Sequence, residues 1–200
     1  MIQKVLLVCS LIASISYSPL PAQEAVAVEF KQPINERIAQ FFGATAKKNW
    51  LGVLNLTYDS LFLLVPKDQM LALFEQMEAE GMEINMGKFA VKDFVGQVDA
   101  DGQHFVNIGY EMEMGLKFSG PSFEAPGVMD FMKTSFETTY GAANINYNKE
   151  ERSFLIKANK NLYAIAPFHS KEWKFVENNL EQQIILEQII PEAVRKAFGN

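Results

Sequence analysis

Tyr58, His104 and Tyr110 are the polar aromatic residues that are best placed to share one site. His104 and Tyr110 lie an even number of positions apart on a predicted strand, so both side chains point to the same face of that strand. Hydroxyl and imidazole groups can transfer a proton or orient a ligand. We expect Tyr147 and Trp173 to lie close to these three residues.

No carboxylate is placed to act as a general base beside them. Glu111 and Glu113 fall on the opposite, polar face of the same strand. Asp59 lies about 100° around its helix from the neighbouring tyrosine. We therefore expect the tyrosines to be core residues whose hydroxyls bond the backbone or a ligand. We expect His104 at the rim of the sheet and His169 in an exposed turn.

Methionine offers a second kind of chemistry, because thioethers bind soft metals such as Cu(I). The candidates are Met82 with Met86, and Met112 with Met114. Met112 and Met114 belong to an unbroken apolar stripe, which favours a role as core filler. The sequence contains no glycine-rich phosphate loop, no His-x-x-x-His spacing and no Gly-x-Ser-x-Gly motif. We therefore expect no cofactor.

The first 22 residues have the layout of a cleaved secretory signal. Lys4 precedes an apolar run at 5–15, and small and turn-forming residues follow it. The run is too short for a permanent membrane anchor, which needs about 20 apolar residues. Cleavage after Ala22 removes Cys9, the only cysteine, and leaves a domain without a disulfide or a thiolate. We expect a secreted or periplasmic protein that does not span the membrane.

The composition indicates one globular domain. The chain has 200 residues, is 48% hydrophobic and contains 16 phenylalanines, which is enough for a core. Its net charge of -6 makes nucleic acid an unfavourable partner. We expect 23–32 to be a short, loosely ordered lead and 33–200 to form a single α+β domain.

The spacing of apolar residues predicts the order of the elements. Helices are expected at 34–48, from Trp50 to a point before Pro66, at 67–80 and at 128–140. Strands are expected at 82–98, 103–118, 143–147, 154–158, 162–168 and 173–176, with a turn at 159–161. The apolar residues between 180 and 198 predict a helical C-terminus that Pro191 interrupts.

The strand at 103–118 is the clearest element, because apolar and polar residues alternate along its whole length. A strand of this length has to bend, and Gly109 and Gly115 are the expected positions of bulges. We expect a curved antiparallel sheet that packs on the N-terminal helices with one face and is solvated on the other.

This order of elements resembles the nuclear transport factor-like cone, a cystatin-like superfamily that includes the ketosteroid isomerases. The resemblance rests on the segment 48–58, which opens with Lys48-Asn49-Trp50, and on the segments 67–81 and 103–118. It implies a curved sheet around a cavity that helices close, and the long C-terminal helix departs from the plainest version of the fold. In the isomerases a tyrosine works beside two buried acids, and that pattern has no residue-by-residue match here.

These observations favour a non-catalytic domain that binds a small apolar ligand or a partner in a cavity between sheet and helices. An isomerase-like or hydrolase-like pocket enzyme is the alternative, and binding of a soft metal by methionine is a second one. Complete filling of the gap by phenylalanine side chains is the competing structural outcome. The residues expected to line the pocket are Trp50, Leu54, Tyr58, Phe74, His104, Ile108, Tyr110 and Met112.

Overall fold

The computed structural model describes residues 23–179 and 182–199. The predicted signal segment, 1–22, lies outside the described residues. Within the described part of the chain, no helix has the length and apolar character needed to cross a membrane.

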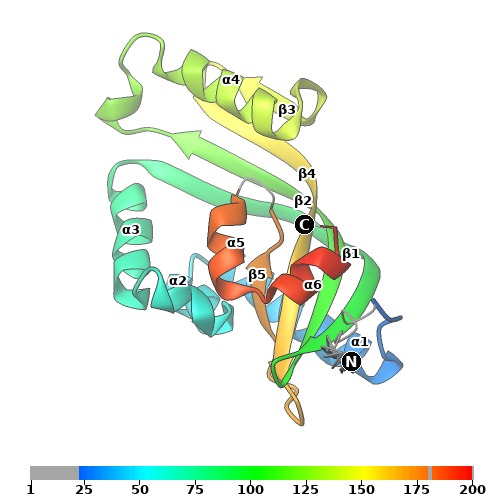
Figure 1. The fold of residues 1–200 in the computed structure, drawn as a ribbon. Helices are drawn as coiled ribbons and strands as arrows, with labels where there is room; N and C mark the ends of the chain where they lie inside the picture. The colour runs from blue at the N-terminus through cyan, green and yellow to red at the C-terminus, as the bar shows by residue number, and fades with distance from the viewer. Residues whose placement is uncertain (1–22, 180–181, 200) are drawn as a thin grey trace, which may run out of the picture.

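An open antiparallel sheet of five strands forms the centre of the structure, in the order β1-β2-β4-β3, with β5 also paired to β4 (Figure 1). Three strands are long: β1 (Met82–Ala100), β2 (Gln103–Phe118) and β4 (Ser153–Pro167). β3 (Ile145–Asn148) and β5 (Lys174–Glu177) are short and pair with different parts of β4. The predicted α+β class with a curved antiparallel sheet is confirmed.

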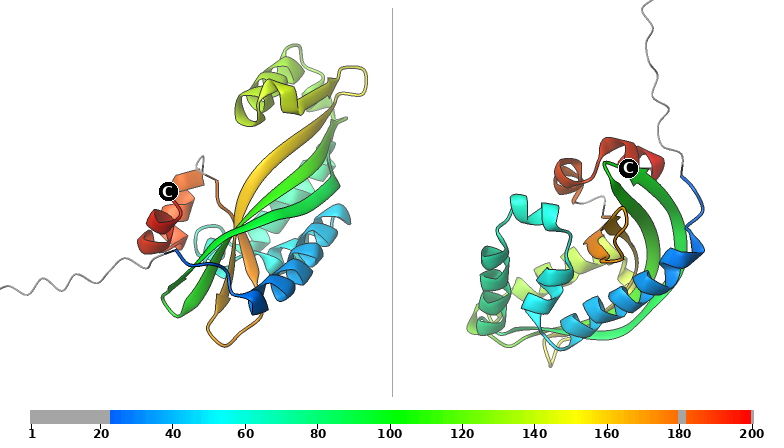
Figure 2. Two further views of the ribbon diagram at one scale, coloured as in Figure 1. Left: turned by 90° about the vertical axis from the view of Figure 1, so that its right-hand side faces the viewer. Right: turned by 90° about the horizontal axis from the view of Figure 1, so that it is seen from below.

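Helices cover both sides of this sheet (Figure 2). The N-terminal helices lie on one side, the C-terminal helices α5 and α6 lie on the opposite side, and α4 lies at the far end of the long strands. The bounds are α1 (Val28–Ala46), α2 (Trp50–Leu56), α3 (Lys67–Ala79), α4 (Val128–Tyr140), α5 (Gln183–Ile189) and α6 (Glu192–Ala197).

The predicted helices at 67–80 and 128–140 and the predicted strand at 103–118 are confirmed within one residue. Gly81 ends α3 with a φ of +88°, a conformation that strongly favours glycine. A Cβ at Gly81 would also collide with the backbone of Gly120, so the chain needs glycine here for both reasons.

The N-terminal lead is more ordered than expected. Glu24 pairs with Gln97 of β1, and α1 begins at Val28 rather than at residue 34. Pro33 therefore lies inside the helix, in its second turn, instead of opening it. The helix predicted from Trp50 is shorter than expected, because after Leu56 the chain leaves the helix to pair with β5. The amide of Tyr58 donates to the carbonyl of Phe175 at 2.9 Å.

The bulges lie in β1 and not at the glycines of β2. β2 pairs with β4 without interruption from Gln103 to Lys117. The pairing of β1 with β2 shifts three times, between Met86 and Phe89, between Val91 and Asp93, and between Phe94 and Gly96. Extra residues in β1 let this outer strand follow the bend of its neighbour.

The turn predicted at 159–161 is wrong, because β4 continues through it as one strand. Asparagine and lysine favour turns, but pairing with β2 overrides that preference. On its other side, β4 pairs with β3 up to Ile156 and with β5 from Leu162. Between these two residues the outer edge of β4 has no strand partner in the described structure.

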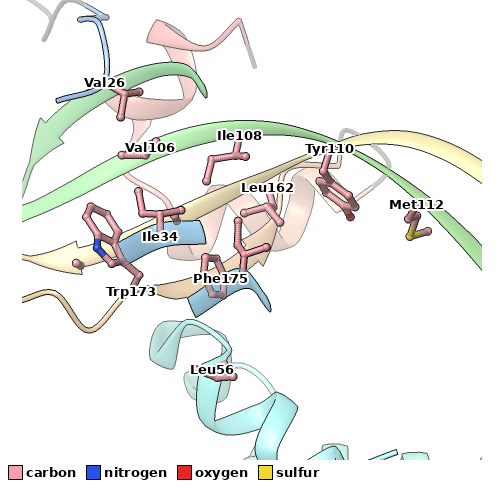
Figure 3. Close-up of a cluster of buried hydrophobic side chains, with 13 residues drawn as sticks. Val26, Ile34, Leu56, Val106, Ile108, Tyr110, Met112, Leu162, Trp173 and Phe175 are labelled. Carbon is pink, nitrogen blue, oxygen red and sulfur yellow. The ribbon is translucent and has the colours of Figure 1, made fainter. Parts of the chain in front are cut away.

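The core is divided between the two faces of the sheet. Figure 3 shows Val106, Ile108, Tyr110 and Met112 along β2 in the cluster that packs against α1 and β5. On the opposite face, Phe105 packs with residues of α5 and α6. The prediction of one solvated face is therefore wrong for the first half of β2, where both faces are buried. It is right for the second half, where polar residues on that face are exposed or partly exposed.

Candidate functional site

A partly open cavity of about 290 Å³ lies on the α1 side of the sheet, between the C-terminal part of α1, the helices α2 and α3 and the end of α4. Every layer on this side of the sheet contributes to its walls. The lining residues are Phe41, Phe42, Thr45, Trp50, Val53, Phe74, Ile84, Met86, Tyr110, Met112, Met114, Tyr140, Lys160, Leu162, Phe175, Val176 and Glu177.

Stacked aromatic rings and thioethers form most of the wall. The rings of Trp50 and Phe74 stack with their centroids 4.6 Å apart and an interplanar angle of 11°. Phe42, Phe89 and Tyr110 contact one another, and the centroid of Phe42 lies 3.6 Å from that of Phe89 and 5.6 Å from that of Tyr110. The indole nitrogen of Trp50 is buried and has no hydrogen-bond partner among the described residues. The wall is therefore largely apolar.

The polar end of the cavity is a hydrogen-bonded cluster around Glu177. The Tyr110 hydroxyl donates to Oε1 of Glu177 at 3.0 Å. Nζ of Lys160 donates to both carboxylate oxygens, at 3.1 Å and 2.9 Å, and lies 5.5 Å from the centroid of the Tyr140 ring. Each charge in this cluster is balanced within the cluster.

Burial raises the pKa of Tyr110 well above its ordinary value of 10.0, and the nearby Glu177 carboxylate raises this pKa further. The Tyr110 hydroxyl therefore stays protonated and serves as a donor. Because Glu177 already accepts from Tyr110 and from Lys160, the cluster holds no unpaired carboxylate that could act as a general base.

Half of the pocket residues predicted from the sequence meet at this cavity. Trp50, Phe74, Tyr110 and Met112 line it. Leu54 and Ile108 do not contribute to its walls, because they are buried in the packed core, with 1% and 0% of their surfaces exposed. They support the site rather than form it.

Tyr58 and His104 lie elsewhere. Tyr58 belongs to the core on the opposite face of the sheet, and its hydroxyl donates to Gln103 at 2.9 Å. Because α2 ends at Leu56, the chain leaves the helix and brings Tyr58 to that face. His104 lies at the rim as expected, where its Nδ1 is 2.8 Å from Asp99 Oδ1. Its ring lies 4.7 Å from that of Phe168.

The two further aromatic residues also lie outside the site. Trp173 is completely buried and packs edge-on against Phe30. Tyr147 stacks on Phe154 at 4.5 Å, in the cluster beneath α4. His169 is exposed in a turn with a φ of +66°, as expected.

Lys160 and Glu177 are the charged site residues that the sequence interpretation misses. The predicted turn at 159–161 includes Lys160, although the alternation of Phe154, Ile156 and Ala158 continues in phase through it to Leu162. A lysine at an inward position of a strand is the signal that indicates a buried charge. No comparable pattern singles out Glu177, which closes a short strand.

The described part of the chain contains no cluster of three or more His, Cys, Asp or Glu side chains that could hold a metal ion. Three thioethers do meet at the cavity, from Met86, Met112 and Met114. Met86 pairs directly with Met114 across β1 and β2. All three also pack against the main core cluster, which is consistent with a role as wall residues.

Comparisons with known proteins do not assign the chain to a family. No protein-family model matches it, and no curated protein matches it. The resemblance to the nuclear transport factor-like cone therefore stays a prediction, and the function has to be argued from the site.

Proposed function

We propose that this protein is an exported, non-catalytic domain that binds a small, neutral, mainly apolar molecule in the cavity between α1 and α4. The observation that carries the proposal is the combination of an aromatic and thioether wall with a polar end whose charges are already paired. Such a wall desolvates an apolar ligand, and a few polar groups fix its orientation.

The volume favours a ligand with one or two rings. About 290 Å³ corresponds to roughly ten water molecules at ~30 Å³ each. Ligand pockets usually span about 300–1,000 Å³, so this cavity is at the lower end of that range. The flexible thioethers of the wall would adapt to more than one ligand shape.

The polar end favours a neutral ligand. Lys160 and Glu177 neutralise each other, so a charged ligand would have to break an existing ion pair to gain a new one. A neutral hydrogen-bonding group could instead lie beside the paired cluster without breaking it. We infer a ligand with an apolar body and at most one or two hydrogen-bonding groups.

Binding is better supported than catalysis. A pocket enzyme of the isomerase or hydrolase type needs an available base, and both polar partners of Glu177 are in place. Among the described residues, the ionisable hydroxyl within hydrogen-bonding distance of Glu177 is that of Tyr110, whose pKa burial raises. The cluster is therefore suited to orienting a ligand rather than to moving its protons.

Titration with naphthalene and with indole, followed by ligand-observed NMR, tests this proposal. We expect saturable binding of both to the wild type and loss of binding in Val53→Phe, whose larger side chain fills the cavity. Val28→Phe is the matched control, because Val28 is 80% exposed and lies outside the cavity. Met114→Phe repeats the test from the opposite wall if the first variant does not fold.

Failure of both compounds to bind the wild type would contradict the proposal. Equal binding by Val53→Phe, Met114→Phe and Val28→Phe would also contradict it, because it would place the compounds outside the cavity.

A further inference from the structure

A second hollow, of about 450 Å³, lies at the outer edge of β4. It occupies the interval between β3 and β5, where β4 has no strand partner on that side in the described structure. Half of its twelve lining residues are asparagines, namely Asn107, Asn144, Asn159, Asn161, Asn178 and Asn179. We call this site the asparagine hollow.

We propose that the asparagine hollow binds a neutral polyhydroxylated group, of which a saccharide is the representative class. This inference does not rest on the apolar cavity, because the two sites share only Tyr140, Lys160 and Glu177 and their other walls differ.

The chemistry of the carboxamide carries the first part of the argument. Each asparagine side chain offers two N–H donors and an oxygen with two lone pairs. A sugar hydroxyl also donates and accepts, so the exposed carboxamides of Asn159 and Asn161 can bond to its hydroxyls in either direction. An apolar ligand would displace water from these two groups without replacing its hydrogen bonds, at a cost of about 1–3 kcal/mol each.

The charge of the hollow favours a neutral ligand over an anion. Among the described residues, Lys160 and Glu177 are the charged residues that line it, and Lys160 Nζ is held by both oxygens of Glu177. No unpaired cation among the described lining residues is available to hold a phosphate or a carboxylate.

Asn107 provides an independent indication of a ligand. Its side chain comes from the middle of β2 and is only 4% exposed. Its Oδ1 atom is buried and has no hydrogen-bond partner among the residues that the structure describes. Buried polar atoms are paired in most proteins, and Asn107 is one of the residues that line the hollow, so a ligand there lies beside its carboxamide. A ligand hydroxyl would then satisfy it.

Aromatic residues complete the lining. Tyr140 and Phe198 contribute to it from α4 and from the end of α6. Their ring faces give apolar surface to the C–H groups of a sugar ring, while the asparagines take its hydroxyls. The hollow therefore offers both kinds of surface that a saccharide presents.

A peptide added as a strand to β4 is the competing occupant, since free strand edges recruit extended segments. The free interval is short, because β3 pairing ends at Ile156 and β5 pairing begins at Leu162. A peptide that adds as a strand places every second side chain in a pocket, and this interval is lined by carboxamides instead of by apolar pockets.

Titration of isotope-labelled protein with maltotriose, cellotriose and chitotriose tests the proposal through the side-chain NH₂ signals of asparagine. We expect at least one trisaccharide to shift the signals of Asn107 and Asn159. Asn159→Ala should weaken that binding by about tenfold, the loss of a hydrogen-bonding side chain. Asn159 is exposed, so its replacement should leave the fold intact. Asn161→Ala tests the same prediction at a second lining residue and should also weaken binding.

Asn35→Ala is the matched control, because Asn35 is an exposed asparagine of α1 outside the hollow, and it should bind like the wild type. The proposal is overturned if no trisaccharide shifts these signals. It is also overturned if Asn159→Ala and Asn161→Ala both bind like Asn35→Ala, or if tetra-alanine shifts the signals and the sugars do not.

Discussion

The Nζ atom of Lys160 lies 2.9 Å from Oε2 of Glu177, and this ion pair is part of the wall between the apolar cavity and the asparagine hollow. The side chains are 20% and 37% exposed, so the pair is only partly screened by water. Tyr110 donates to the same carboxylate from the cavity side. The pair therefore fixes the polar end of one site and the floor of the other.

Replacement of Lys160 by methionine should lower the free energy of unfolding by about 1–3 kcal/mol, because it leaves the Glu177 carboxylate without its cation. Lys92→Met is the matched control, since its partner Glu111 is also glutamate but both side chains are at least half exposed. The control should change stability by less than about 0.5 kcal/mol. Urea unfolding measures both, and equal effects would show that Lys160 is not a structural cation.

Tyr110→Phe should cost about 1.5 kcal/mol or more at neutral pH, because it removes a buried hydrogen bond to a carboxylate. It should also change the alkaline limb of the stability curve. Because the pKa of Tyr110 is raised in the folded protein, its protonated hydroxyl contributes to the free energy of unfolding. This contribution is complete below about pH 10, where the tyrosines of the unfolded chain are still protonated. Above that pH the unfolded chain loses the proton first, so the wild type loses stability as the pH rises.

The variant lacks this contribution, so its stability should fall less steeply above pH 10 than that of the wild type. Urea unfolding at pH values from neutral to strongly alkaline measures the two slopes. Parallel curves for the two proteins would mean that the hydroxyl is not held as the structure shows.

Met112→Leu and Met114→Leu should each cost less than about 1.5 kcal/mol, because both residues serve as adaptable wall and core residues. Titration of the wild type with Cu(I) should give no tight stoichiometric site. A tight site that disappears in the double variant would instead assign the methionines to a soft-metal centre.

Export is tested by mass spectrometry of the periplasmic or secreted fraction. Because Lys4 and the apolar run at 5–15 have the layout of a cleaved signal, we expect a chain that begins near Gln23. A chain that retains Met1 in the cytosol would contradict export and would leave the two binding proposals unaffected.

The periodic parts of the fold are predictable from the sequence, because hydrophobic spacing depends only on local geometry. The alternation from His104 to Phe118 predicts β2, and the stripe that ends at Gly81 predicts α3. The gap at the bend of the sheet also follows, since a straight helix cannot follow a twisted surface.

The face that each residue occupies is less predictable. Periodicity shows which side chains share a face, but it does not show which helices cover that face. Phe105 lies between Gln103 and Asn107 on the face expected to be polar, and this single apolar residue is the only local sign that α5 and α6 cover it. The prediction that Tyr58 shares a face with Tyr110 is wrong, because its position depends on a backbone pairing with Phe175, more than a hundred residues away.

The methyl groups of methionine provide the most direct test of ligand binding in the apolar cavity. Met86, Met112 and Met114 line it, whereas Met129 and Met132 of α4 pack in the cluster beneath that helix and do not. With isotope-labelled methionine methyls, naphthalene should shift the signals of the first three residues and leave those of Met129 and Met132 unchanged. If naphthalene shifts none of the five, or shifts only Met129 and Met132, the proposed ligand site is wrong.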